Sequence, residues 1–354
     1  MLHPIPNSIF RRRLLRIVVM QRRLMAELCA LPQDYVIDEA WLQSVWPTVS
    51  VEWIRRFWEN DSGNRANWLT TIAAAPEADK QIIRDMIAEQ LRFAELYQDP
   101  PTIRLTRHNW NTPVFRSLNN LLKSFYAPLF YKREGYLKPS GESFHKDHFI
   151  SGFTPRFRIC PYTDNYIQDT KLDHFLPKDE FPMLSCHPDN LIPCSSDPNS
   201  VGHKGAEIPL DSAEIDQAKH WYHPRLRPCA VGSYRLLFPA VPASQPQIDF
   251  EAVSAADQPR LDNMVRLFGL GSFWGGFLDD EVQNIASDVS GLLSFDGNPP
   301  TGENVKAGIL LRARQEQGRI GRDGLAIVKS FFYEHIAQTP VLLAQVVRIC
   351  AQGT

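Results

Sequence analysis

Residues that can bind metal ions or carry protons are concentrated in about one fifth of this chain. Half of the 10 histidines and half of the 6 cysteines lie between residues 132 and 204 of the 354-residue sequence. They are His145, His148, Cys160, His174, Cys186, His187, Cys194 and His203. Imidazoles and thiolates are common metal ligands, and histidine also exchanges protons near neutral pH. We therefore look for the functional site in this stretch.

Four short blocks follow one another within the stretch. They are Cys160-Pro-Tyr-Thr163, Leu172-Asp-His-Phe-Leu-Pro-Lys178, Asp189-Asn-Leu-Ile-Pro-Cys194 and the residues from Asp197 to Gly205. In this order they resemble the HNH endonuclease motif, over roughly 45 of the 354 residues. The resemblance implies a ββα-metal fold, in which a β-hairpin and a helix hold one divalent ion.

The Asp-His pair of the second block would carry the chemistry that the resemblance implies. Phosphodiester hydrolysis needs an activated water, and a histidine with a pKa of about 6.5 is suited to that task, so we expect His174 to be the general base. Asp173 points to the other side of an extended backbone, where its carboxylate can bind the cation. In the family the middle Asn, here Asn190, hydrogen-bonds across the long loop and keeps the histidine ring oriented.

A helix supplies the second protein ligand in this family. Asn199 fits this role by its position and His203 by its strength as a ligand, and their four-residue spacing puts both on one helix face. Two protein ligands leave places for water and phosphate oxygens, which suits one Mg²⁺ or Mn²⁺ ion. We expect Lys204 and Lys178 to contact the substrate phosphate.

Many family members also bind a structural zinc ion through two C-x-x-C pairs, and this sequence departs from that pattern. Its pairs read Cys160-Pro-Tyr-Thr163 and Cys194-Ser-Ser-Asp197, so each has lost one cysteine. A four-thiolate site is therefore excluded. Two alternatives stay open, a zinc-free hydrogen-bonded remnant and a mixed site. The mixed site would combine Cys160, Cys194 and Asp197 with one of Cys186, His187 or His203.

The elements that must position this module are mainly helical. The sequence predicts an α+β protein, mostly α, with a helical region over 1–131, an embedded HNH module over 132–225 and a mainly helical region over 226–354. Thr112 before Pro113 is a typical helix start. Further helices are expected over 77–97, 211–219, 305–314, 325–336 and 341–349, and short strands over 157–160, 167–172, 234–238 and 247–253.

An amphipathic helix with a basic face is expected near the N-terminus. Apolar residues recur at helical spacing with arginines between them, at Leu14, Val18, Met25 and Leu28. Two arginines at 22 and 23 end the apolar run well before the roughly 20 residues that a membrane span needs. The basic face has two interpretations, a solvated face in a helical bundle or a phosphate-contacting face.

Composition excludes several classes of protein. With 44% apolar and 22% charged residues the chain is neither disordered nor collagen-like. Its 38 basic and 40 acidic residues give a net charge of −2, so DNA binding would need a local basic patch. Scattered cysteines and the lack of an export signal favour reduced thiols and the cytoplasm, with no membrane association.

The expected function is therefore divalent-metal-dependent hydrolysis of phosphodiester bonds in DNA, as in an HNH endonuclease. The alternative is a catalytically inactive HNH-fold subunit that binds DNA or a partner protein. Nucleases of this type with helical extensions resemble effectors of bacterial antiphage defence or mobile-element systems. In such systems an ATPase or another sensor controls cutting, so a co-encoded protein of that kind is an expected partner.

Overall fold

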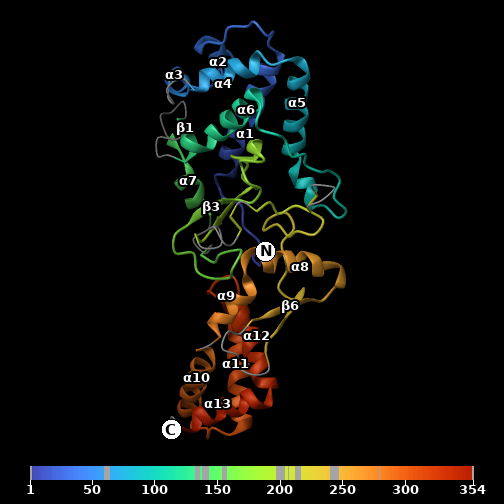
Figure 1. Ribbon diagram of the computed structural model, residues 1–354. Helices are drawn as coiled ribbons and strands as arrows, with labels where there is room; N and C mark the ends of the chain where they lie inside the picture. Colours follow the sequence, from blue (N-terminus) through green and yellow to red (C-terminus); the bar gives the residue numbers. More distant parts are fainter. Residues whose placement is uncertain are drawn as a thin grey trace.

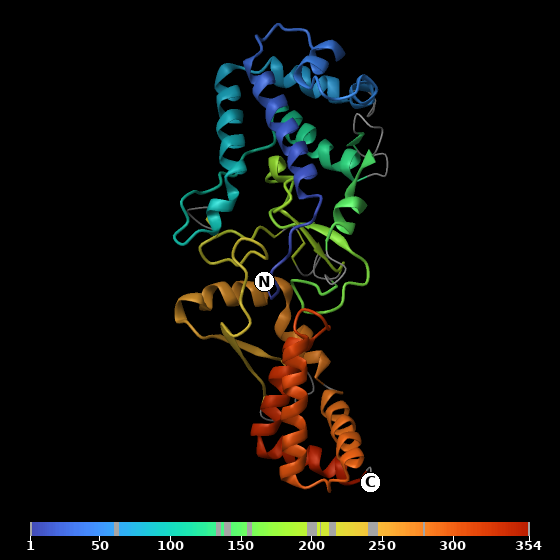
Figure 2. The ribbon, with the colours of Figure 1, turned by 180° about the vertical axis from the view of Figure 1, so that it is seen from behind.

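The computed structural model describes residues 2–59, 64–131, 136–137, 143–153, 158–196, 204–205, 207–211, 217–239, 247–278 and 280–352. The molecule is elongated, with one group of helices at each end and a β-hairpin between them (Figure 1; Figure 2 shows the opposite side). Helices predominate and the strands are short, so the expected α+β, mostly α class is confirmed. No helix in the described ranges is long and apolar enough to cross a membrane.

The N-terminal helices pack around an aromatic core. They are α1 (Arg11–Ala30), α2 (Glu39–Val45), α3 (Val51–Glu59), α4 (Asn64–Ala73), α5 (Glu77–Leu91) and α6 (Pro113–Ser124), with a 3₁₀ turn at Phe93–Tyr97 and a π turn at Phe125–Phe130. The ring centroid of Trp46 lies 5.3 Å from Phe57 and 6.0 Å from Phe125, both edge to face, a geometry that aromatic pairs prefer. The predicted start of α6 is confirmed, because the Thr112 side chain accepts a hydrogen bond from the Phe115 amide.

The central part of the chain holds two small hairpins. Its elements are β1 (Tyr136–Leu137), β2 (Ser143–Phe144), α7 (Lys146–Ser151), β3 (Lys171–His174), a 3₁₀ turn (Pro182–Leu184) and β4 (Leu191–Cys194). β1 pairs antiparallel with β2, and β3 pairs antiparallel with β4. The second hairpin carries the Asp-His block, and it lies below the N-terminal helices in Figure 1.

The C-terminal end is a hairpin followed by a helical bundle. Its elements are β5 (Tyr234–Leu237), β6 (Asp249–Ala252), a 3₁₀ turn (Ala255–Asp257), α8 (Gln258–Phe268), α9 (Leu270–Phe277), α10 (Glu281–Asp296), α11 (Gly302–Arg319), α12 (Ala326–Gln338) and α13 (Pro340–Gln352). Gly308 lets α11 approach α10 closely, since a β-carbon there would lie 2.9 Å from a Val289 methyl group. The helices predicted over 305–314, 325–336 and 341–349 and the strands over 234–238 and 247–253 are confirmed, with small shifts of their ends.

Two other predicted elements differ from the structure. Of the strand predicted over 167–172 only residues 171–172 are in β3, and of the strand predicted over 157–160 only Ile159 pairs, in an isolated antiparallel bridge with Tyr166. A turn closes this bridge, in which the Cys160 amide donates to the Asn165 carbonyl at 2.7 Å. The Ile167 amide bonds the Arg158 carbonyl at 2.7 Å, so only residues 171–174 remain to pair with β4. Of the helix predicted over 211–219, residues 212–216 lie outside the described ranges, and the residues beside them are not helical.

The N-terminal segment connects the central part to the C-terminal bundle. The Leu2 amide donates to the Pro161 carbonyl at 3.0 Å. His3 Nε2 lies 2.5 Å from Asp164 Oδ1, and the other carboxylate oxygen of Asp164 accepts from the Ile327 amide at 2.8 Å. Asp164 is completely buried, so this carboxylate joins the start of the chain, the turn before β3 and the start of α12.

Candidate active site

The β3–β4 hairpin sets the framework of the candidate site. Asp173 lies opposite Ile192 and His174 lies opposite Leu191 in its register. Every residue of β4 is buried, so this strand anchors the hairpin in the hydrophobic core. The loop over 175–190 joins the two strands and must fold back on itself to close the hairpin.

The carboxylate of Asp173 is buried and has two partners. Its Oδ1 lies 2.9 Å from the ammonium of Lys204, and its Oδ2 accepts a hydrogen bond of 2.7 Å from the Tyr162 hydroxyl. The Lys204 side chain is 1% exposed and also donates to the His174 carbonyl at 2.7 Å. Two buried charges are tolerated when each is paired and its remaining polar atoms are satisfied, as here. Lys204, which we expected at the substrate phosphate, therefore faces Asp173 in this structure.

The imidazole of His174 contacts a different set of residues. Its Nε2 lies 2.9 Å from the Ser185 carbonyl, and its ring packs edge to face on Tyr126 with the centroids 4.4 Å apart. Because a carbonyl only accepts, Nε2 carries the proton and Nδ1 keeps the lone pair. Burial of the ring lowers the pKa of His174 to about 4, against the opposing effect of the Ser185 bond. The ring is therefore neutral at pH 7, and it is a weaker base than an unperturbed histidine with a pKa of about 6.5.

Asn190 closes the loop that carries Ser185. Its side-chain oxygen accepts from the Leu176 amide at 2.7 Å, and its side-chain nitrogen donates to the carbonyls of Leu176 at 3.0 Å and Leu184 at 3.2 Å. The residue is completely buried. Since Leu184 directly precedes Ser185, these bonds position the carbonyl that orients His174.

Arginines from distant parts of the chain hold the same loop from outside. Asp189 accepts from Arg11 at the start of α1, with a shortest distance of 2.5 Å, and lies 3.1 Å from Arg225. Gln21, almost three turns further along α1, donates to the Ser185 hydroxyl at 3.3 Å. The loop is therefore clamped to α1 at two points.

Cys160 and Cys194, the cysteines that remain of the two C-x-x-C pairs, lie in the same buried region as Asp173. Burial raises the pKa of the Cys194 thiol well above its usual range, and the neighbouring Asp173 and Cys160 raise it further. Cys160 and Cys194 are fully buried free thiols. The Thr163 carbonyl accepts a hydrogen bond of 3.0 Å from the Trp274 indole.

Of the other residues considered for zinc, Cys186 and His187 are within the described ranges and the rest are outside them. Cys186 is a buried free thiol, and burial lowers the pKa of the neighbouring His187 to about 4. Asp197 and both candidate helix ligands, Asn199 and His203, fall among residues 197–203, which are outside the described ranges. Among the residues that the structure does describe, no group of three or more His, Cys, Asp or Glu side chains could hold a metal ion.

Lys178 lies at the outer side of the hairpin loop. Its ammonium is 3.2 Å from the carboxylate of Asp179, and its side chain is 33% exposed. Lys123 of α6 pairs with the same carboxylate at 2.7 Å. Of the two lysines expected at phosphate, Lys178 is the one that reaches solvent.

Comparison with known proteins identifies one shared segment. No protein-family model matches the chain, and no solved structure matches it. Protein ea31 of Escherichia phage lambda is 40% identical to it over 63 residues. This segment is 18% of the chain and 20% of the phage protein, so the match spans about a fifth of that relative's length.

Sequence patterns did not indicate several residues that complete the site. Tyr162 bonds Asp173 directly, and its only signal is its place inside the first cysteine block. Ser185 acts through its backbone carbonyl, which any residue would supply. Arg11 reaches the hairpin from α1 and Tyr126 from the π turn after α6, and no local pattern in the sequence links either of them to the Asp-His block.

Proposed function

We propose that this protein is a divalent-metal-dependent DNA endonuclease of the HNH type. The observation that carries the proposal is the pairing of a buried carboxylate, Asp173, with a neutral imidazole, His174, on adjacent residues of one strand. A closed loop holds the imidazole through Ser185, and Asn190 closes that loop. This supports the arrangement that the sequence resemblance implies.

Asp173 suits the binding of a hard cation. Its carboxylate is an oxygen donor of the kind that Mg²⁺ and Mn²⁺ prefer, and a divalent ion would take the place that the ammonium of Lys204 has in this structure. A bound divalent ion would stabilise the negative charge that develops on the phosphate and on the leaving oxygen. The second ligand would be Asn199 or His203, as the resemblance implies.

His174 would take the proton from the attacking water. Its Nε2–H is held by the Ser185 carbonyl, which directs the lone pair of Nδ1 away from that bond. The ring is neutral at physiological pH because burial lowers its pKa to about 4, so no proton has to leave before it can act. Lys178, at the exposed side of the loop, would contact a phosphate of the strand.

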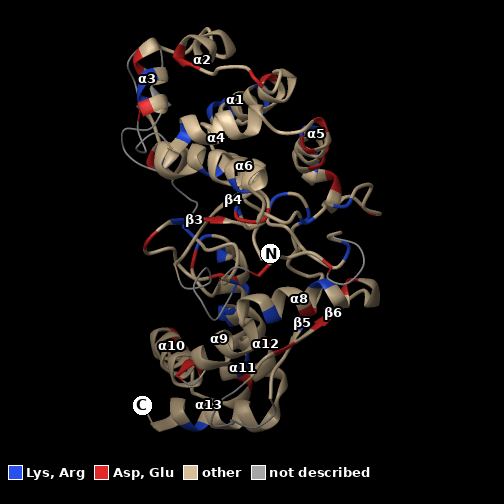
Figure 3. Ribbon diagram, turned by 45° about the horizontal axis from the view of Figure 1, so that its top comes forward, with Lys and Arg blue, Asp and Glu red and all other residues tan. Residues whose placement is uncertain are grey.

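Lys and Arg are distributed along the whole chain, so DNA binding would rely on local phosphate contacts such as that of Lys178. Figure 3 shows Lys and Arg interspersed with Asp and Glu along the molecule, in agreement with the net charge of −2. Affinity that depends on local phosphate contacts falls steeply as salt increases. The proposal includes a role in a defence or mobile-element system, in which a co-encoded ATPase or sensor would control cutting.

Plasmid cleavage with purified protein in Mg²⁺ or Mn²⁺ tests this proposal. Wild type should relax or linearise supercoiled DNA, and EDTA should stop the reaction. His174→Ala should lower the rate at least about 100-fold, the usual contribution of a general base. His335→Ala, in α12 of the distant bundle, is the matched control and should cleave like wild type. Equal cleavage by the His174 and His335 variants would contradict the assignment.

One observation favours the second candidate function, a subunit that binds DNA or a partner without cutting. Both oxygens of Asp173 are already occupied, by Lys204 and by Tyr162. If Lys204 permanently neutralises Asp173, no cation enters. DNA binding by wild type without cleavage, alone or with the co-encoded partner, would favour this alternative; cleavage only after that partner is added would favour the regulated nuclease.

A further inference from the structure

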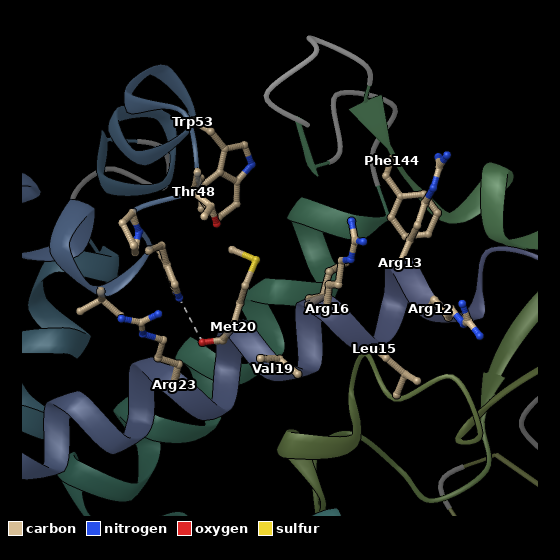
Figure 4. Close-up of a pocket in the computed structure, with 15 residues that line it drawn as sticks. Arg12, Arg13, Leu15, Arg16, Val19, Met20, Arg23, Thr48, Trp53 and Phe144 are labelled. Atoms are coloured by element: carbon tan, nitrogen blue, oxygen red, sulfur yellow. Dashed lines mark hydrogen bonds between the residues drawn. The ribbon is translucent and has the colours of Figure 1, made fainter.

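A groove runs along the solvent side of α1. Figure 4 shows Arg16 and Met20 extending from α1 toward Trp53 of α3 on one side and Phe144 of β2 on the other. Val45 at the end of α2 and residues 46–49 of the connection to α3 complete its wall, and the cavity volume is about 570 Å³. We call this feature the α1 groove. It lies in the N-terminal group of helices and shares no residue with the candidate active site.

The α1 groove is strongly basic. Four arginines line it, Arg12, Arg13, Arg16 and Arg23, and the described residues that line it include no aspartate or glutamate. Arg13 lies over the Phe10 ring, 4.8 Å from its centroid. Arg12, Arg16 and Arg23 are exposed and make no ion pair within the described part of the chain. On a helix their positions differ by 4 and 7 residues, which places the three residues in one row along a face of α1.

The floor of the α1 groove is apolar. Val19 is 62% exposed, and Leu15 and Met20 are partly exposed on the same helix. Val49 adds an apolar side chain from the opposite wall. An exposed apolar surface next to arginines is characteristic of protein interfaces, which are enriched in Met, Arg and aromatic residues.

A nucleic acid fits this surface less well. Single strands bind through bases stacked on exposed aromatic faces, but Trp46 and Trp53 are only 3% and 2% exposed. The Trp46 indole is also fixed, since it donates to the Met20 carbonyl at 3.2 Å. A sugar-phosphate backbone would pair with the arginines but would not cover the apolar floor. A ligand with both carboxylates and apolar side chains would pair with the arginines and also cover the floor.

We propose that the α1 groove binds an acidic amphipathic segment of another protein. Apolar side chains of that segment would pack on Val19, Met20 and Val49, and its carboxylates would pair with the row of Arg12, Arg16 and Arg23. The row extends about 16 Å along the helix axis, so it matches a segment of three helical turns. Arginine–carboxylate pairs give orientation as well as affinity, because the guanidinium can bond both oxygens.

The opposite face of α1 contacts the hairpin loop of the candidate active site. Gln21 donates to the Ser185 hydroxyl in that loop and to the Leu122 carbonyl of α6. Arg11 at the start of the same helix holds Asp189. The inference itself does not depend on the nuclease proposal, since it concerns binding alone.

A selection from a displayed library of random 16-residue peptides tests the inference on the full-length protein. Enriched peptides should carry Asp or Glu flanking Leu, Met, Phe or Ile at helical spacing. In fluorescence anisotropy, Arg16→Glu/Arg23→Glu should weaken the binding of such a labelled peptide at least tenfold, and so should Val19→Asp. The matched control is Lys306→Glu/Arg348→Glu, which makes the same charge change on exposed residues of α11 and α13 and should bind like wild type.

A labelled 20-base-pair DNA duplex and a 20-nucleotide single strand serve as competing probes. Circular dichroism and thermal unfolding of each variant show whether its fold is intact. The inference is wrong if enriched peptides lack acidic residues, if the Arg16/Arg23 and control variants bind the peptide equally, or if the Arg16/Arg23 variant loses DNA affinity tenfold while no peptide is enriched. Loss of plasmid cleavage in His174→Ala leaves all of these peptide results unchanged, so the two proposals fail separately.

Discussion

Lys204 and Asp173 form a buried ion pair between residues 31 positions apart in the sequence, with 2.9 Å between Nζ and Oδ1. Their side chains are 1% and 4% exposed. The ammonium also bonds the His174 carbonyl, so one lysine contacts both residues of the Asp-His block. It is the positive charge that keeps the Asp173 carboxylate compatible with burial.

Removing that charge should destabilise the protein strongly. Lys204→Met leaves the buried carboxylate without its counter-charge, and we expect a loss of about 3–5 kcal/mol in the free energy of unfolding. Urea unfolding followed by circular dichroism measures it. Adding Asp173→Asn to the same protein should cost much less than the sum of the two single changes, because the pair acts as a unit.

Lys178→Met is the matched control for this experiment. Lys178 pairs with Asp179 at the surface, and such pairs contribute less than about 1 kcal/mol. Equal losses in the Lys204 and Lys178 variants would show that the buried pair does not hold the hairpin.

Asn190→Ala should open the hairpin loop. The change removes three hydrogen bonds and leaves the amide and the carbonyl of Leu176 buried without partners, while the Leu184 carbonyl keeps its bond from the His187 amide. We expect a loss of about 3 kcal/mol in stability. Hydrogen exchange at the Leu176 amide should become faster, and the free energy of opening calculated from it should fall by the same amount. Asn263→Ala, which removes a single partly buried bond to the His220 carbonyl, should cost about 1 kcal/mol. An unchanged Leu176 exchange rate in the Asn190 variant would refute the role of this side chain.

Stability should decrease in mild acid because of buried neutral histidines. Burial lowers the pKa of His187 to about 4 in the folded protein. In the unfolded chain its pKa is about 6.5, so between about pH 6.5 and 4 the unfolded state binds a proton that the folded state does not bind. The stability of the fold with a neutral His187 is therefore fully present above pH 6.5. It is lost as the pH falls toward 4, by up to about 1.4 kcal/mol per pH unit. His223, whose pKa is lowered well below 6.5 by burial, acts in the same direction.

The variant His187→Gln isolates this effect. Its unfolding free energy, measured in urea at pH 7, 6 and 5, should fall less steeply than that of wild type. Identical slopes for the two proteins between pH 6 and 5 would show that His187 is protonated equally in the folded and unfolded states.

Local patterns predicted much of the helical architecture and one part of the candidate site. The Thr112-Pro113 cap and the apolar spacing of the flanking regions depend on neighbouring residues, and the helices follow them. The Asp-His pair on a strand and the bonds of Asn190 also involve a stretch of fewer than 20 residues. The ends of β3 were less predictable, because a turn stabilised by the Cys160–Asn165 bond uses residues with strand-like sequence.

The sequence alone determined which groups are available for chemistry, since an imidazole next to a carboxylate on an extended chain follows from residue type and from the two-residue repeat of a strand. Only the tertiary structure decided what surrounds them. Tyr126 and Ser185 bury the His174 ring, and Lys204 reaches Asp173 from beyond the hairpin. Burial and charge pairing depend on which distant segments pack together, and these contacts set the pKa of His174 and the partner of Asp173.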